Sequence, residues 1–402
     1  MAALNAWQKI TRVVGGKPFG NGSDGAYASA TIPTIVYEAI ASASADQTSI
    51  TAAGTTLSDN DLLLIIQMRG TGVGQWEINK VASGGGTTSI VLSKDLHYAY
   101  TDSGNSEAQA VVIPQYTNVT VQSGTWSLTD WDKNEGGIFV LACSGTLTIE
   151  GAISGVGEGG GAGSPDDPNH GGTGIGYHGG ASFADNGVTG YAGEGSTGDE
   201  VIQTSANGNG GGGGNTPAGG GRAGGGGGGN GTAGQNGETG IYEGTGGTGG
   251  TVDGSADLLD FVIGGAGGGG TIGDASPNNY AGAGGCGGGG IFIFAKTIAD
   301  MDTAGGTIAL TGGAGGGGGG ANANEGGGGG AGGSMIVQCK DADFGTGNVS
   351  AAGGSGLYNG GDGGVGRFAV HHSGTVEGTT SPTFDNTEDL TLIESGGFLG
   401  IL

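Results

Sequence analysis

Positively charged residues are scarce in this sequence, which has 11 lysines and arginines against 37 aspartates and glutamates and a formal net charge of −26. A protein that binds a phosphate backbone needs a basic footprint, so we expect no nucleic-acid partner. Anionic membrane surfaces are disfavoured for the same reason. The acidic balance instead suits a soluble protein that is exposed outside cells, or it serves solubility alone.

Cysteines and long apolar runs are also few. The three cysteines, Cys143, Cys286 and Cys339, are odd in number and form no C-x-x-C pair, which argues against a disulfide framework and a metal site. We expect them to be small buried residues. The longest apolar run, residues 62–66, is far too short to span a bilayer, so no membrane insertion is predicted.

Residues 1–10 have neither the basic start nor the continuous apolar segment of a signal peptide. An acidic, glycine-rich chain nonetheless belongs outside cells. Virion proteins meet both conditions, because they assemble in the cytoplasm and are released by lysis. We therefore expect an extracellular location within a virion, with a bacterial or archaeal cell surface as the alternative.

Glycine is present in large excess, with 106 glycines and 8 prolines but no Gly-X-Y period, so the chain is not a collagen. Glycine loses the most conformational entropy on folding and has no side chain to bury. Its runs become ordered where backbones pack closely on one another, as in a lattice of polyglycine helices akin to polyproline II. The other route is clamping by a partner copy.

A short phrase recurs within residues 136–374: two glycines, several apolar residues, a bend, a second short strand and a return to glycine. Its copies begin at Gly136, Gly289, Gly332 and, in a worn form, Gly363. Repeated strand pairs of this kind predict a β-solenoid whose stacked rungs cover one another. In residues 138–143 both alternating sets of side chains are apolar, so we expect both faces of this strand to be buried.

We predict an all-β chain with four parts. They are an N-terminal docking arm at residues 1–34, a small antiparallel β-barrel or sandwich at 35–135, a glycine-rich β-solenoid with polyglycine-II-like loops at 136–374, and a C-terminal tail at 375–402. A long glycine-rich insertion at residues 158–288 interrupts the solenoid.

The strands expected in the second part are residues 34–40, 61–68, 75–81, 89–93, 110–116 and 119–123. Residues 62–66 are apolar without alternation, so this strand should be buried on both faces. Trp76, Trp126 and Trp131 should supply large core side chains. One more strand is expected inside the insertion, at residues 258–263.

Isolated aromatic residues among the glycines are the best candidates for a binding surface, because they have no local core to join. They either plug the flank of the solenoid or are presented at its tips. The candidate receptor contacts are Tyr177, Phe183, Tyr191, Tyr242, Tyr280 and Tyr358. Apolar residues near the two chain ends are candidates for assembly between copies, namely Trp7, Phe398, Leu399, Ile401 and Leu402.

Catalysis is not predicted. No G-x-S-x-G elbow occurs between a strand and a helix, and G-x-G-x-x-G matches carry no information in so glycine-rich a chain. The acid pairs Asp166–Asp167 and Asp199–Glu200 could serve glycan cleavage, but a chain with this many acids forms such pairs by chance. Loop acids could also bind structural calcium, although solvated carboxylates are the default. We therefore predict neither an enzyme nor a required cofactor.

The glycine runs with the phrases at residues 289–295 and 332–337 resemble those of glycine-rich adhesins and phage tail-fibre tip proteins, over roughly residues 136–370. The tip proteins pack polyglycine helices to display aromatic loops to a bacterial receptor. The resemblance implies a virion fibre or spike component that binds a host-surface glycan or outer-membrane protein. The alternative is a self-assembling subunit of an extracellular filament or surface matrix. Both predict association with copies of itself.

Overall fold

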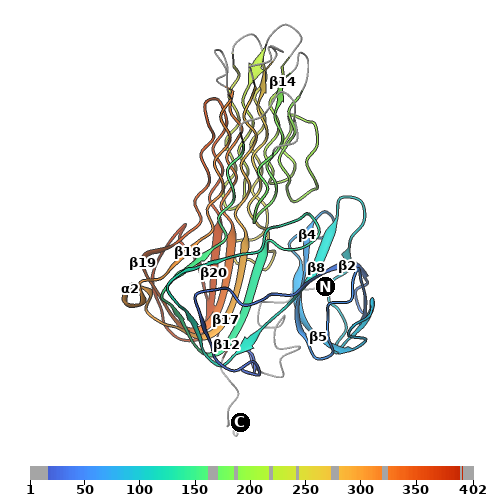
Figure 1. Ribbon diagram of the computed structural model, residues 1–402, viewed down its shortest axis with the longest axis vertical. Helices are drawn as coiled ribbons and strands as arrows, with labels where there is room; N and C mark the ends of the chain where they lie inside the picture. Colours follow the sequence, from blue (N-terminus) through green and yellow to red (C-terminus); the bar gives the residue numbers. More distant parts are fainter. Residues whose placement is uncertain are drawn as a thin grey trace.

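The computed structural model describes residues 17–161, 171–184, 189–216, 221–240, 244–272, 280–318, 325–389 and 392. A small barrel lies beside a curled sheet, and a bundle of extended glycine-rich segments rises from that sheet (Figure 1). Nearly all regular structure in these residues is β. The one helix among them is α2 (Met301–Ala304), which begins after the capping residue Asp300. The predicted all-β class is confirmed in its coarse form: the described residues are nearly all β.

The barrel is antiparallel and closed. A barrel was one of the two architectures predicted for this part of the chain. Its strands run in the ring order β3, β6, β5, β4, β8 and β2, which returns to β3, and β7 pairs with β2. The strands are β2 (Tyr37–Ala43), β3 (Ser49–Ala52), β4 (Leu62–Arg69), β5 (Trp76–Ser83), β6 (Ser89–Leu92), β7 (Tyr100–Thr101) and β8 (Glu107–Val112).

Strand β4 is buried on both faces, as its unbroken apolar run predicts. Leu63 and Ile65 point into the barrel core, whereas Leu64 and Ile66 pack outside the barrel against the curled sheet. The barrel is therefore joined to the sheet by an apolar interface. Tyr100 is the largest side chain in the barrel core, and Trp76 lies at the outer interface instead.

The curled sheet is parallel and consists of twelve strands. They are β1 (Tyr27–Ser29), β9 (Gln115–Tyr116), β10 (Val119–Val121), β11 (Thr125–Ser127), β12 (Ile138–Ile149), β13 (Ala152–Ser154), β17 (Gly290–Ile298), β18 (Thr307–Ala309), β19 (Ser334–Ser350), β20 (Arg367–His372), β21 (Val376–Ser381) and β22 (Asp385–Glu388).

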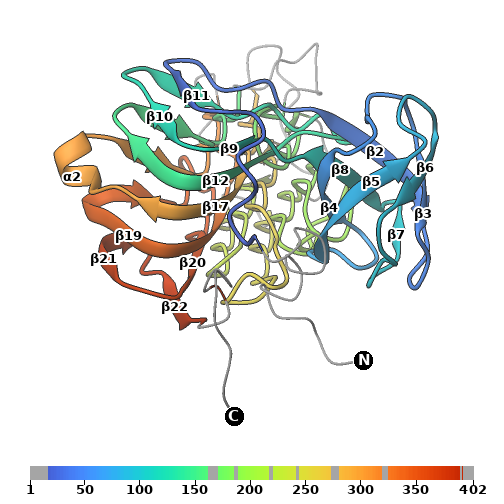
Figure 2. The ribbon, with the colours of Figure 1, turned by 90° about the horizontal axis from the view of Figure 1, so that it is seen from below.

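The recurring apolar phrases lie side by side in this sheet. Phe139 on β12 pairs with Ile291 on β17, which pairs with Met335 on β19, which pairs with Phe368 on β20. Their second strands also pair in parallel, β13 with β18 and β18 with the end of β19. Viewed from below, the sheet curls around its own core and the barrel lies to one side (Figure 2). The observed architecture is a curled parallel sheet; a full β-solenoid remains a prediction.

Both faces of the central strands are buried, as the sequence predicts. Phe139 and Leu141 face the core inside the curl, and Val140 faces the barrel. Cys143 and Cys339 lie in the inner core, and all three cysteines are buried and free. They are small core residues, as expected.

Three predictions from the sequence need correction. Residues 115–116 and 119–121 do not belong to the barrel, because they pair in parallel with β12. Residues 258–263 form no strand. Ser255, Asp257 and Leu259 are instead joined in a hydrogen-bonded turn, and the apolar side chains that follow cover the barrel–sheet interface. Residues 376–388, predicted as tail, contain β21 and β22 at the edge of the sheet.

We call the glycine-rich segments that extend beyond this sheet, between residues 155 and 366, the stem, and each extended segment a string. Consecutive N–H groups of one string donate to different neighbouring strings. The hydrogen bonds of one such run are Gly227 N to Gln235 O (2.8 Å), Gly228 N to Gly329 O (2.9 Å) and Gly229 N to Asn209 O (2.7 Å). Backbone groups thus satisfy one another in several directions, without side chains.

The strings approach so closely that only glycine fits. A Cβ atom added at Gly328 would lie 2.0 Å from the carbonyl oxygen of Gly226. Near the end of the stem farthest from the barrel, three two-residue strands form a small sheet (Figure 1). They are β14 (Phe183–Ala184), β15 (Arg222–Ala223) and β16 (Thr271–Ile272). None of the residues in these three strands is a glycine.

Candidate functional site

Tyr177, predicted as a receptor contact, is a core residue. Its side chain is fully buried, and its hydroxyl donates a hydrogen bond to the carbonyl oxygen of Met68 in the barrel. Its ring packs edge-on against Trp131. This tyrosine therefore plugs the junction of barrel and stem, and it is removed from the candidate receptor contacts.

The other predicted contacts lie in different places. Tyr191 and Tyr280 are half-buried along strings of the stem. Phe183 lies in β14 at the distal end. Tyr242 falls outside the described residues, as do all five candidate assembly residues, Trp7, Phe398, Leu399, Ile401 and Leu402.

Tyr358 is the predicted contact that is most exposed among the described residues. Its side chain is 62% exposed and follows Leu357, which is 41% exposed. Both lie where the string formed by residues 351–366 turns back, and Tyr358 adopts the left-handed conformation there, with φ 49°. Its backbone forms an antiparallel bridge with Glu325 on the neighbouring string. The turn therefore holds an aromatic ring out from the stem.

A polar cluster lies beside this ring. The carboxylate of Glu325, which is 1% exposed, accepts a hydrogen bond of 2.9 Å from the side-chain amide of Asn359. Burial raises the pKa of Glu325, although the Asn359 hydrogen bond and the charge of Arg222 act in the opposite direction. The Nε atom of Arg222 is buried and has no hydrogen-bond partner within the described part of the chain.

We call Arg222, Glu325, Leu357, Tyr358 and Asn359 the distal patch. Glycine packing brings them together from three distant segments. A Cβ atom at Gly224 would lie 1.9 Å from the carbonyl oxygen of Asn359, so a larger residue would force these strings apart. The exposed ring of Tyr358 can contact the apolar face of a sugar, and the half-buried Asn359 and Arg222 beside it can hydrogen-bond with its hydroxyls. The buried carboxylate of Glu325 holds the Asn359 amide in place.

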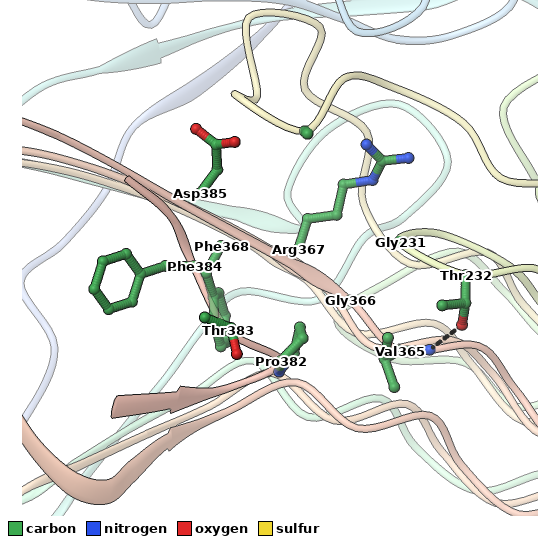
Figure 3. Close-up of a pocket in the computed structure, with 11 residues that line it drawn as sticks. Gly231, Thr232, Val365, Gly366, Arg367, Phe368, Pro382, Thr383, Phe384 and Asp385 are labelled. Carbon is green, nitrogen blue, oxygen red and sulfur yellow. Dashed lines mark hydrogen bonds between the residues drawn. The ribbon is translucent and has the colours of Figure 1, made fainter. Parts of the chain in front are cut away.

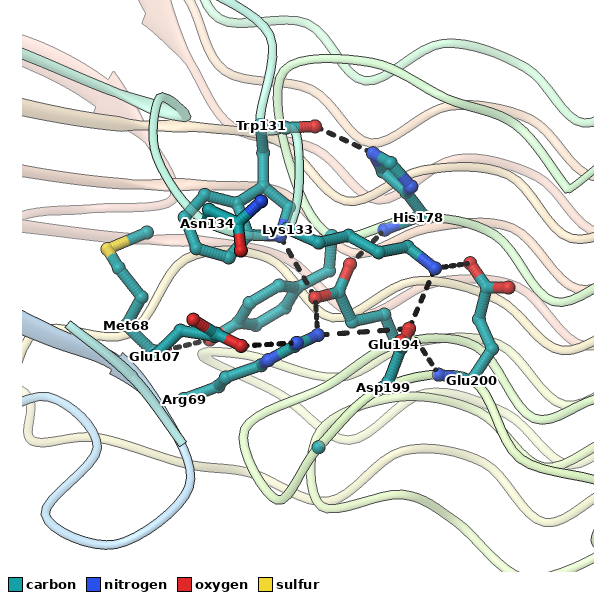
Figure 4. A network of polar contacts seen from close by, with 12 residues as sticks. Met68, Arg69, Glu107, Trp131, Lys133, Asn134, His178, Glu194, Asp199 and Glu200 are labelled. Atoms are coloured by element: carbon teal, nitrogen blue, oxygen red, sulfur yellow. Dashed lines mark hydrogen bonds and ion pairs between the residues drawn. The ribbon is translucent and has the colours of Figure 1, made fainter. Parts of the chain in front are cut away.

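A second polar cluster joins the barrel to the stem (Figure 4). Arg69 on β4 contacts Glu194 in the stem and Glu107 on β8, the latter at 3.1 Å. Glu194 also accepts hydrogen bonds from the Trp131 indole (2.9 Å) and the backbone N–H of His178 (3.0 Å). These contacts satisfy a fully buried carboxylate, so the cluster is a structural link.

The acid pair Asp199–Glu200 belongs to this link. Lys133 Nζ lies 2.8 Å from Asp199 and 3.5 Å from Glu200. Burial raises the pKa of Glu200 to about 7, and nearby Glu194 and Asp199 add to this against the charge of Lys133. Burial also acts to raise the pKa of Asp199, but the hydrogen bonds from Lys133 and the Glu200 backbone, together with the charges of Lys133 and Arg69, outweigh it and lower the pKa.

Two pairings in these clusters could not be predicted from local sequence patterns. Arg69 and Glu194 are 125 residues apart, and no local pattern marks a pair at that separation. Arg222 and Glu325 likewise come from separate strings. The one signal that the sequence offers is a charged residue inside a glycine run, because such a residue needs a partner if it is buried.

Two findings concern ligands and membranes. Among the residues that the structure describes, no group of three or more His, Cys, Asp and Glu side chains is placed to hold a metal ion. The predicted loop acids Asp166 and Asp167 lie outside those residues. No described helix is long and apolar enough to cross a membrane.

Comparisons with known proteins give partial structural matches. No family model and no curated protein matches the chain. Solved structures do match. Among them are the Gp54 tailspike of Acinetobacter baumannii bacteriophage AP22 in complex with A. baumannii capsular saccharide, at 15% identity, and the tailspike protein gp49 from Pseudomonas phage LKA1, at 18% identity. Each match covers 31% of this chain, with a TM-score of 0.18.

The matches span 24% and 26% of the two tailspikes, about a quarter of each. At this TM-score the likeness carries no argument about function. Both matches are phage tail proteins, as are the tail-fibre tip proteins that the glycine-rich phrases resemble. One prediction is corrected: we expected a protein that is not an enzyme, but nothing in these matches, both of them tailspikes, supports that assignment. The non-enzymatic assignment is therefore withdrawn.

Proposed function

We propose that this chain is a component of a phage tail and that its distal patch binds a glycan on the host surface. The observation that carries the proposal is Tyr358, which is 62% exposed at a turn of a stem built largely of glycine. A tyrosine exposed at this turn contributes little buried surface to the core of its own chain. Tyrosines presented on rigid turns are effective binding anchors, because little side-chain entropy is lost on contact.

The stem is suited to present such an anchor. We infer that its strings are polyglycine-II helices, since consecutive N–H groups donate to different neighbours, as at Gly227, Gly228 and Gly229. A backbone lattice of this kind gives a slender, rigid support. The acidic net charge of −26 favours an uncharged or weakly charged ligand.

Binding of the whole protein to a panel of purified capsular polysaccharides and lipopolysaccharides tests the proposal. Tyr358→Ala should weaken binding to the recognised polysaccharide by at least about tenfold, as expected for an anchor residue. Tyr358→Phe keeps the ring and should retain most of the affinity. The matched control is Ile202→Ala, since Ile202 is 54% exposed elsewhere on the stem and should not affect binding.

The unfolding midpoint should be the same for all three variants, because both side chains are largely exposed. Binding of Tyr358→Ala with unchanged affinity would overturn the proposed role of the distal patch. A failure of every glycan in the panel to bind the unaltered protein would overturn glycan recognition itself.

A further inference from the structure

A groove of about 410 Å³ lies at the base of the stem, where strand β20 begins. The two strings that carry Arg222 and Tyr358 of the distal patch lead to this groove at Thr232 and Arg367. Its volume is within the usual range of small-ligand sites. Arg367 on β20 and Asp385 on β22 contribute its charged groups, Thr232 comes from a string of the stem, and Pro382 and Phe384 provide apolar surface. Arg367 and Asp385 project on the same side of their strands (Figure 3).

Within the described residues, the guanidinium of Arg367 is held in place without an ion pair to a carboxylate. Its Nη2 atom donates to the carbonyl oxygen of Asn230 at 3.2 Å, and its Nε atom is buried without a hydrogen-bond partner among the described residues. Asn230 is fully buried and is itself fixed by Ser334 at 3.1 Å. A half-buried arginine with unused hydrogen-bonding capacity calls for a further partner.

The charges around the groove indicate which partner fits. Asp385 lines the same groove, and one of its oxygens accepts a hydrogen bond of 3.1 Å from Thr387. Burial lowers the pKa of Arg367, and the charges of Asp253 and Asp257 act against that shift. One cation is thus set among three acids, which disfavours an anionic ligand. A neutral ligand rich in hydroxyls can accept from Arg367 and donate to Asp385.

We propose that this groove is a second carbohydrate site, which takes a neutral sugar residue. Ring hydroxyls would accept hydrogen bonds from Arg367 and donate to Asp385, and Pro382 would supply apolar contact, whereas Phe384 packs on Phe344 in the inner core. The proposal rests on the proposed function, because it assumes that the protein binds glycans. A polysaccharide that contacts both this groove and the distal patch would gain avidity from the two sites.

Titration of the whole protein with short oligosaccharides tests the groove separately from the distal patch. The probes are neutral gluco-, galacto- and manno-oligosaccharides, with oligogalacturonate as the acidic comparison. Arg367→Met removes the donor, and Asp385→Asn keeps the shape of the acceptor without its charge. Each should weaken binding of the preferred neutral oligosaccharide by at least about tenfold. Lys340→Met, at an exposed ion pair elsewhere, is the control and should bind normally.

The outcomes separate the two proposals. Oligosaccharide binding that survives Tyr358→Ala but is lost in both groove variants supports the groove. Binding that is lost only in Tyr358→Ala overturns the groove and leaves the distal patch standing. Tighter binding of oligogalacturonate than of every neutral probe, with dependence on Arg367, overturns the neutral ligand class. Asp385→Asn keeps the test valid if Arg367→Met fails to fold, since Asp385 lies on the short edge strand β22.

Discussion

Arg69, on barrel strand β4, donates a hydrogen bond from Nη1 to the Oε1 atom of Glu194 in the stem. Both side chains are buried, with 5% and 0% exposed. The contact links two parts of the molecule that otherwise meet mainly through apolar side chains. Burial disfavours the charge of Arg69, but Glu194 and Glu107 outweigh this and raise the pKa of its guanidinium.

Removal of this arginine should therefore be costly. Arg69→Met leaves Glu194 charged and buried without its cation, and we expect the free energy of unfolding to fall by about 3–5 kcal/mol. The double variant Arg69→Met/Glu194→Gln should recover part of this loss, because no uncompensated buried charge remains. Denaturant unfolding measures both. A loss in Arg69→Met no larger than that in Lys340→Met would contradict a role for this link.

Glu200 makes the stability of the protein depend on pH. Its pKa is raised from 4.5 to about 7 in the folded chain, so the folded state holds this proton more tightly than the unfolded state. The resulting stabilisation is complete below about pH 4.5 and is lost as the pH rises through 7. A shift of this size corresponds to about 3 kcal/mol.

The variant Glu200→Gln isolates this effect. We expect the unfolding midpoint of the unaltered protein to decrease as the pH is raised from 4.5 to 7.5. The variant should show a flatter profile and greater stability at pH 8. The contribution of Asp199 to the pH dependence of stability has the opposite sign. Because its pKa is lowered in the folded chain, the stability that it contributes is lost as the pH falls towards 3. Parallel profiles for the two proteins across pH 4.5 to 7.5 would rule out Glu200 as the titrating group.

The parts of the fold that could be predicted are those that depend on local pattern. Apolar residues at both parities of residues 138–143 indicated a strand buried on both faces, and the recurring phrases indicated strands that stack. The strand predicted at residues 258–263 was wrong, because an apolar run can also cover an interface without pairing with other strands. Tyr177 misled for a related reason: its partner Met68 is 109 residues away. Burial of an isolated aromatic depends on such distant contacts.

Glycine in the stem is required by contact between backbones. Gly328→Ala would place its Cβ atom 2.0 Å from the oxygen of Gly226, and neither backbone can retreat without breaking other hydrogen bonds. We expect a loss of about 3 kcal/mol, at the upper end for overpacked cores. Gly159→Ala is the matched control, since its nearest atom would be 3.4 Å away. It should be neutral or stabilise by about 0.4–1 kcal/mol. Equal unfolding midpoints for the two variants would refute close packing of the strings.

The interface between barrel and sheet depends on one aromatic group. Phe292 on β17 is fully buried, with ring centroids 4.1 Å from Phe261 and 5.1 Å from Trp76 on barrel strand β5. Phe292→Ala removes the ring that joins three segments and should lower the free energy of unfolding by about 3–5 kcal/mol. Val252→Ala, at a side chain that is 52% exposed, should change it by less than about 0.5 kcal/mol.

Because Trp76 belongs to the barrel and Phe292 to the sheet, this substitution also tests whether the two unfold together. In the unaltered protein, tryptophan fluorescence and far-ultraviolet circular dichroism should report one coincident transition. In Phe292→Ala the interface is weakened while the barrel core around Ile65 and Tyr100 is intact, so the barrel should unfold at a higher denaturant concentration than the sheet. A single coincident transition at the original midpoint would show that the aromatic contact does not couple them.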